Sequence, residues 1–340
     1  MTKKPPYAVG WDILPGVSRS FALVIRWLPR GLDDAVMTAY LLCRVADTLE
    51  DAVLPVDDRR RMLARFAASL DGGSPELPAG GYPPGYKRLL DHVDAVLAGY
   101  RALPPKAREV IAASVREMCE GMSKWCGREI RTLDDQNDYC YYVAGLVGRM
   151  LTGLFQAYGL VDARRKERLD RYAVDFGLAL QKVNVIRDIR SDLTEGRCFW
   201  PEDLIEKRGL TRESLLRPSN GPRAIAVMDD LIRDAWRYTE RAVRYMTLLP
   251  VLQWRLRMFC AIPLFMAVAT LGTCWKNPKV FQSDRPVKIT SRQTRWIIVR
   301  SLAFGQINRL VESWYRRWRL TAEAQPRGWP APALRSHAEA

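Results

Sequence analysis

The chain has 340 residues, of which 48% are hydrophobic and 27% are charged, so it can bury a large core and is not a disordered protein. Its formal net charge of +15 suits an anionic partner or surface. We expect one large domain, because nothing in the sequence resembles an interdomain linker.

Two features bear on where the protein works. Seven cysteines are scattered without metal-ligand spacing, and no secretory signal opens the sequence, so we expect reduced thiols in the cytoplasm. The uncharged stretch Met258 to Trp275 is just long enough to cross a membrane, but a core helix has the same composition and is favoured here. Residues 319–340 are polar and contain prolines, so we expect no C-terminal transmembrane anchor.

The helical period dominates the chain. Gly31, Asp33 and Asp34 provide a cap and an acidic first turn for a helix that runs to Glu50. Further helices are predicted at 57–70, 87–100, 105–125, 133–158, 164–193, 210–216, 222–249 and 258–275. No alternating strand pattern occurs, so the predicted fold class is all-α.

Two acidic clusters stand out on these helices. Asp47 and Asp51, like Asp188 and Asp192, are four residues apart, so each pair shares one helix face. Like charges on one face repel each other and call for a cation; Mg²⁺ prefers oxygen ligands and bridges carboxylates to phosphates. Basic and amide side chains precede each cluster, namely Arg44, Gln181, Asn184 and Arg187. The pattern indicates a diphosphate site.

The C-terminal part of the chain is basic. From Arg285 onward there are eleven Lys or Arg against three acidic residues, and aromatic side chains alternate with arginines between 296 and 320. Two interpretations stay open: peripheral contact with an anionic membrane, centred on residues 314–319, or an amphipathic helix packed on the core. No nucleic-acid-binding signature is present, so no nucleic acid partner is expected.

Six ordered motifs resemble those of the squalene synthase family over about residues 15–320. They are Ser18–Phe21, Arg44–Asp51, Tyr139–Gly148, Gln181–Asp188, Phe199–Pro201 and Phe259–Pro263. The resemblance implies an isoprenoid-synthase-type helical bundle around a central apolar cavity. We expect this catalytic domain over residues 1–320, followed by a polar, flexible tail at 321–340.

The resemblance also implies a reaction and its residues. Squalene synthases join two farnesyl diphosphates head to head through presqualene diphosphate and reduce this intermediate with NADPH. Tyr142 matches a tyrosine proposed to assist proton removal, and the catalytic set adds the four aspartates at 47, 51, 188 and 192. The implied Mg²⁺ ligands are Asp47, Glu50, Asp51, Asp188 and Asp192. The implied substrate contacts are Ser18, Arg19, Ser20, Phe21, Tyr40, Arg44, Gln181 and Asn184. The implied NADPH contacts are Arg19, Arg44, Arg187 and Lys288.

The sequence departs from the family pattern in places and leaves alternatives open. Ser191 stands where animal-type relatives have Glu, and Thr290 stands where a second basic residue is expected near the cofactor, with Arg292 close by. The segment Glu195–Pro201 resembles the squalene-forming branch. One alternative is the same fold stopping before reduction, at presqualene diphosphate, hydroxysqualene, dehydrosqualene or phytoene. Another is a non-enzymatic basic membrane-surface protein, against which the intact aspartates argue.

Overall fold

The computed structural model describes residues 6–80 and 82–324, apart from the side chains of Arg19 and Ser20. Within these ranges there are helices and loops and no strand, which confirms the predicted all-α class. The α-helices are α1 (Ala8–Val17), α2 (Arg19–Ile25), α3 (Leu32–Glu50), α4 (Val56–Ser69), α5 (Pro84–Asp91), α6 (Val93–Ala102), α7 (Pro105–Trp125), α8 (Leu133–Cys140), α9 (Leu146–Ala157), α10 (Ala163–Arg187), α11 (Ile189–Thr194), α12 (Glu202–Glu206), α13 (Gly221–Leu248), α14 (Trp254–Cys274), α15 (Lys279–Gln282), α16 (Ser291–Phe304) and α17 (Asn308–Glu323). The remaining turns are the π-helix η1 (Tyr141–Gly145) and the 3₁₀ turns η2 (Arg212–Ser214) and η3 (Pro218–Asn220).

Local signals set several helix starts as predicted. Gly31 precedes α3 with a φ of 87°, a conformation that glycine adopts without strain, and its N–H donates to the Asp33 carboxylate at 2.8 Å. Pro105 begins α7, where its missing N–H costs no helical hydrogen bond. The predicted starts of these two helices are therefore confirmed.

The helix predicted at 87–100 is wrong as a single element, because the chain breaks at His92 between α5 and α6. The break follows from packing against α1. A Cβ atom at Gly85 would lie 2.1 Å from the Gly16 carbonyl oxygen, so the backbones of α5 and α1 are in direct contact. This contact fixes the direction of α5 independently of α6. Similarly, the helix predicted at 133–158 contains a π-helical turn, and the one predicted at 164–193 ends at Arg187.

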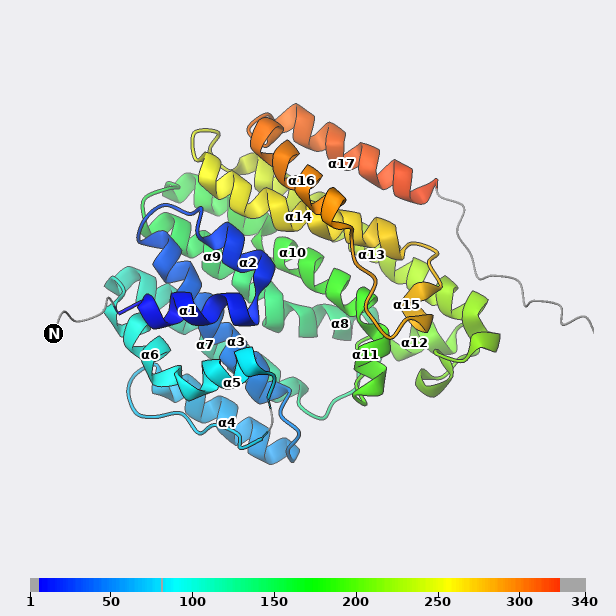
Figure 1. Cartoon of the computed structure of the whole chain (residues 1–340), viewed down its shortest axis with the longest axis horizontal. Helices are drawn as coiled ribbons and strands as arrows, with labels where there is room; N and C mark the ends of the chain where they lie inside the picture. Colours follow the sequence, from blue (N-terminus) through cyan, green and yellow to red (C-terminus); the bar gives the residue numbers. More distant parts are fainter. Residues whose placement is uncertain (1–5, 81, 325–340) are drawn as a thin grey trace, which may run out of the picture.

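The long helix α10 lies at the centre of the bundle, packed against α9, η1, α13 and α14 (Figure 1). Its approach to η1 and α9 depends on two glycines. A Cβ atom at Gly148 would lie 1.9 Å from the Ala173 oxygen, and one at Gly177 would lie 2.0 Å from the Ala144 oxygen. The helices therefore touch backbone to backbone, and most helices share one hydrophobic core.

Among the described residues, α14 is the one helix long and apolar enough to cross a membrane, but 78% of its apolar window is buried inside the protein. It packs against α2, α10, α13, α16 and α17. This arrangement agrees with the predicted core helix.

Helix α17 carries part of the basic aromatic region, and two of its aromatic side chains are buried. Trp314 is buried and stacks on Phe265 with ring centroids 3.8 Å apart, and Tyr315 is buried with its hydroxyl 3.0 Å from that of Thr239. These two aromatic side chains thus pack on the core, as the amphipathic-helix interpretation predicts, whereas Arg316 and Arg317 are exposed and the membrane contact centred on residues 314–319 stays a prediction. The predicted domain boundary at 320 falls inside α17, and residues 325–340 lie outside the described part of the chain.

Candidate active site

An apolar cavity of about 250 Å³ runs between α2, α3, α9, α10 and α14. Phe21 and Tyr40, both predicted substrate contacts, form part of its wall with ring centroids 5.5 Å apart. The other apolar side chains of the wall include Ile25, Val36, Val143, Val147, Met150, Leu151, Phe176, Leu180 and Phe259. The close contact of α9 and α10 at Gly148 and Gly177 shapes this wall, because both glycines line the cavity. The space suits a flexible hydrocarbon chain.

A second, polar cavity of about 420 Å³ adjoins the first. The two share Arg44, Asp47, Val143, Gln181 and Asn184, so an elongated ligand can occupy both. All five predicted metal ligands line the polar cavity, namely Asp47, Glu50, Asp51, Asp188 and Asp192. The structure therefore brings together two clusters that lie far apart in the sequence.

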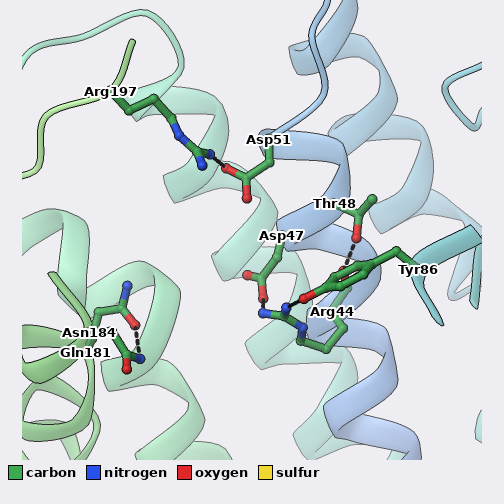
Figure 2. Close-up of polar contacts among 8 residues, drawn as sticks. All are labelled: Arg44, Asp47, Thr48, Asp51, Tyr86, Gln181, Asn184 and Arg197. Atoms are coloured by element: carbon green, nitrogen blue, oxygen red, sulfur yellow. Dashed lines mark hydrogen bonds and ion pairs between the residues drawn. The ribbon is translucent and has the colours of Figure 1, made fainter. Parts of the chain in front are cut away.

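The first cluster stands on the last turns of α3 (Figure 2). Arg44 donates from Nη1 to Asp47 Oδ2 at 2.8 Å, and its other terminal nitrogen donates to the Tyr86 hydroxyl. The guanidinium group also lies 5.1 Å from the centroid of the Tyr86 ring. Thr48 anchors this turn by donating to the Arg44 carbonyl at 2.7 Å. Tyr86, from α5, also lines the polar cavity, and no pattern in the sequence pointed to it.

The second cluster stands at the break between α10 and α11. Asp188 is the capping residue between α10 and α11, and Arg187 Nε donates to Asp188 Oδ1 at 2.7 Å. The Asp192 N–H still donates to the Asp188 carbonyl at 3.0 Å, so the two carboxylates keep their helical spacing. Across the cavity, Gln181 and Asn184 pair through their amides (Figure 2).

The segment Glu195–Pro201 closes one side of the polar cavity. Arg197 forms an ion pair with Asp51 and lies between the two acidic clusters (Figure 2). Phe199 stacks on Tyr139 with ring centroids 4.9 Å apart. Trp200 Nε1 donates to the Val185 carbonyl at 3.0 Å and holds the segment on α10. Sequence reasoning used this segment only as a marker of the product and missed Arg197. The available signal was a lone arginine two residues after Glu195 and five residues after Asp192.

The carboxylates crowd one another in a poorly solvated place. Burial, together with the charge of Asp51, raises the pKa of Asp47 to about 6. Burial, together with Asp188, raises the pKa of Asp192 to about 7, and burial also raises the pKa of Glu50 well above its usual value. Carboxylates in this situation are stabilised by added positive charge. The site is thus short of cations despite its arginines.

These residues fit Mg²⁺ held jointly with a ligand. In the described ranges no three acidic, His or Cys side chains converge closely enough to hold an ion by themselves. Mg²⁺ is commonly bound through one or two carboxylates plus substrate phosphates and water, so a pair of aspartates on each side of the cavity is a sufficient protein contribution. The donor set is all oxygen, as this ion prefers.

Other predicted residues lie outside the two cavity walls. The Tyr142 ring packs on Gly121, where a Cβ atom would meet it at 1.9 Å, and lies 5.3 Å from Lys124 Nζ. Lys288 is exposed in the loop before α16. Ser18 caps α2 by accepting from the Phe21 N–H at 3.1 Å, whereas the side chains of Arg19 and Ser20 lie outside the description.

Comparison with known proteins agrees with this geometry. A family model described as squalene/phytoene synthase matches residues 14–293. The squalene synthase of Schizosaccharomyces pombe is 35% identical over 300 residues, which make up 86% of this chain and 64% of that protein. Squalene synthase LSS of Botryococcus braunii is 36% identical over 286 residues, or 82% of this chain and 60% of that protein. The chain thus spans less than two thirds of the length of these relatives.

Solved structures give the same answer for the fold. TcSQS in complex with the ligand BPH1237 is 31% identical, with a TM-score of 0.86 over 94% of this chain and 92% of that chain. A dehydrosqualene synthase, at 21% identity and a TM-score of 0.60, shares the fold. Since the family match covers most of the chain and both halves of the site, this chain belongs to the squalene/phytoene synthase family.

Proposed function

We propose that the protein condenses two farnesyl diphosphates head to head through presqualene diphosphate and reduces the intermediate with NADPH to squalene. The observation that carries this proposal is the apolar cavity opening into a cavity lined by five acidic residues. A farnesyl chain fits the first cavity and its diphosphate fits the second. The two relatives named above are squalene synthases that are 35% and 36% identical to this chain over most of its length, which supports this product.

The leaving diphosphate is the centre of the proposed chemistry. Bound Mg²⁺ supplies Lewis acidity and neutralises the charge that accumulates on the diphosphate. Asp47 and Asp51 on one side, with Asp188 and Asp192 on the other, would hold it. Arg44, Arg187 and Arg197 line the same cavity, and their guanidinium groups donate to the departing oxygens. Arg44 and Arg187 are preoriented by their aspartate partners.

The apolar cavity protects the carbocations that follow ionisation. The Phe21 and Tyr40 rings can face a developing positive charge without reacting with it. The base that closes the cyclopropane stays a prediction. Tyr142 has a cationic neighbour in Lys124, as a phenol acting as a base needs, but does not line the cavities. Tyr139 does line the polar cavity, yet burial and Glu50 raise its pKa well above the usual value, so little phenolate is available to accept a proton.

NADPH supplies hydride in the second half of the proposed reaction. Arg44 and Arg187 at the polar cavity would hold the cofactor phosphates, with Lys288 and Arg19 as further predicted contacts. Support for Lys288 comes from its loop. Arg190 of α11 donates to the Phe281 carbonyl and to Asp284, both at 2.8 Å, and so ties the segment before Lys288 to the helix that carries Asp192. Thr290 is occupied as the cap of α16, accepting from the Gln293 N–H at 3.2 Å.

Product analysis tests the proposal. The purified protein is incubated with farnesyl diphosphate and Mg²⁺, with and without NADPH, and the lipid extract is identified by mass spectrometry. Squalene that requires NADPH supports the proposal. Dehydrosqualene, phytoene or hydroxysqualene as the end product with NADPH present would replace it by the non-reducing alternative, and no consumption of farnesyl diphosphate would refute both.

The proposal includes a place of action. Farnesyl diphosphate is charged and squalene is a hydrocarbon, so we propose a cytoplasmic enzyme that meets an anionic membrane at its periphery. The free thiols of the seven cysteines suit a reducing compartment. Equal activity and recovery of the protein with and without the cell membrane fraction would contradict the peripheral contact.

A further inference from the structure

Two neighbouring turns present an unusual number of exposed apolar side chains. The α13–α14 turn carries Val251, Leu252 and Trp254, of which Leu252 is 92% exposed. The end of α16, the α16–α17 turn and the start of α17 carry Leu302, Phe304, Ile307 and Leu310, all at least 41% exposed. We call these seven residues the two-turn surface. Contiguous exposed apolar patches are uncommon on monomeric proteins and mark interaction sites.

A buried arginine holds the two turns together. Arg257 is fully buried, and its Nε donates to the Gly305 carbonyl at 2.8 Å while its Nη1 donates to the Leu249 carbonyl at 2.9 Å. Its Nη2 donates to Asn308 Oδ1 at 2.6 Å, and the Asn308 amide donates to the Thr247 carbonyl at 3.1 Å. Both turns accordingly lie close together, along the upper edge of the molecule in Figure 1. A buried charge is costly to hold without partners, so this network fixes the surface rigidly.

Positive charge surrounds the two-turn surface. Residues 249–258 and 300–310, which include both turns, contain four arginines, at 255, 257, 300 and 309, and no acidic residue. Arg255 and Arg309 adjoin the surface, are exposed and form no ion pair with any described residue. The Arg300 Cζ atom lies 3.8 Å from the centroid of the Trp296 ring. A pair of a charged and an aromatic side chain of this kind suits an interface between water and lipid.

The surface is also close to the apolar cavity. Helix α14 begins at Trp254 on the surface, and its residues Phe259, Cys260 and Pro263 line the cavity. At 1.5 Å per helical residue these positions are about 7 to 14 Å from Trp254 along the axis. One rigid helix therefore joins the exposed apolar surface to the place where the hydrocarbon chain would lie.

We propose that the two-turn surface docks on an anionic lipid membrane, with its apolar side chains among the acyl chains and its arginines on the headgroup phosphates. This inference adds to the proposed function by naming the surface that contacts the membrane. It rests on the proposed function in one respect: a hydrocarbon product has to be delivered to lipid. A second copy of the chain is a less suitable occupant, because a symmetric contact would bring the same unpaired arginines together. An anionic surface neutralises them.

Vesicle flotation of the full chain tests this inference, without substrate. We expect binding to phosphatidylcholine vesicles that contain phosphatidylglycerol and little binding to phosphatidylcholine alone. Raising the salt from about 0.1 M to 1 M shortens the screening length from about 10 Å to about 3 Å and should weaken the binding. Phe304→Glu and Leu252→Glu, one on each turn, should each lower the partition coefficient about tenfold or more. Arg309→Gln should lower it about fivefold.

The matched control is Val53→Glu, which inserts the same charge at a fully exposed valine in the loop between α3 and α4 and should leave binding unchanged. Unaltered thermal melting of the variants shows that each remains folded. Wild-type binding by both Phe304→Glu and Leu252→Glu, or equal binding to both vesicle types, would overturn the inference. So would a lipid-free dimer in sedimentation that Phe304→Glu dissociates, since the surface would then join two copies. Because flotation needs no catalysis, failure of the proposed reaction and failure of this docking are separate results.

Discussion

Gly177→Ala tests whether the backbone contact between α10 and η1 determines both stability and the shape of the apolar cavity. The added Cβ atom would lie 2.0 Å from the Ala144 oxygen and 2.8 Å from the Gly145 Cα atom. Carbon and oxygen atoms in ordinary contact are about 3.4 Å apart, so the two helices would have to separate by about 1.4 Å. Neither obstacle is a flexible side chain that could rotate away.

The expected magnitude is the balance of two effects. Replacing a mid-helix glycine by alanine favours the helix by about 0.5–1 kcal/mol, whereas overpacking against fixed neighbours costs about 1–3 kcal/mol or more. We expect Gly177→Ala to lower the free energy of unfolding by about 1–2 kcal/mol on balance. Because Gly177 also lines the apolar cavity, the consumption of farnesyl diphosphate should fall as well.

Urea unfolding followed by circular dichroism measures the first effect, and a turnover assay measures the second. Gly99→Ala is the matched control, since Gly99 is buried in helix α6 and an added Cβ atom would meet its nearest neighbour at 3.5 Å. That variant should be as stable as the wild type or more so. If Gly177→Ala matches Gly99→Ala in stability and turnover, the helices are not held by backbone contact and the reasoning is refuted.

Three further predictions concern the chemistry. Asp47→Asn and Asp188→Asn should each slow presqualene diphosphate formation by about 10²–10³, because the departing diphosphate loses charge stabilisation; near wild-type rates at saturating Mg²⁺ would contradict this. Lys288→Ala should leave farnesyl diphosphate consumption largely intact while squalene falls and presqualene diphosphate or a derived alcohol rises; an unchanged product ratio across NADPH concentrations would count against Lys288. In the native protein a thiol reagent should modify Cys198 first, because the other six cysteines are buried. Burial raises the pKa of the Cys198 thiol, which slows the reaction but does not block access. The Cys198→Ser variant should lose this early reaction.

The sequence by itself determined most of the helices and the chemical content of the site. Local rules suffice for these features: a glycine cap before α3, a proline at the start of α7 and carboxylates at helical spacing depend on neighbours within one or two turns. The same spacing predicted that Asp47 and Asp51 share a face, and both line the polar cavity. The ordered motifs then predicted the family, which the family match confirms.

Only the tertiary structure decided which of the eligible side chains take part. Tyr139 and Tyr142 are equivalent in local pattern, but the π-helical turn at 141–145 leaves Tyr139 in the polar cavity and Tyr142 against Gly121. Arg197 reaches Asp51 across 146 positions of sequence, a pairing set by how the segment after α11 packs. Likewise Trp314 is buried while Phe304 is exposed, because burial depends on which helix covers a residue and not on its own hydrophobicity.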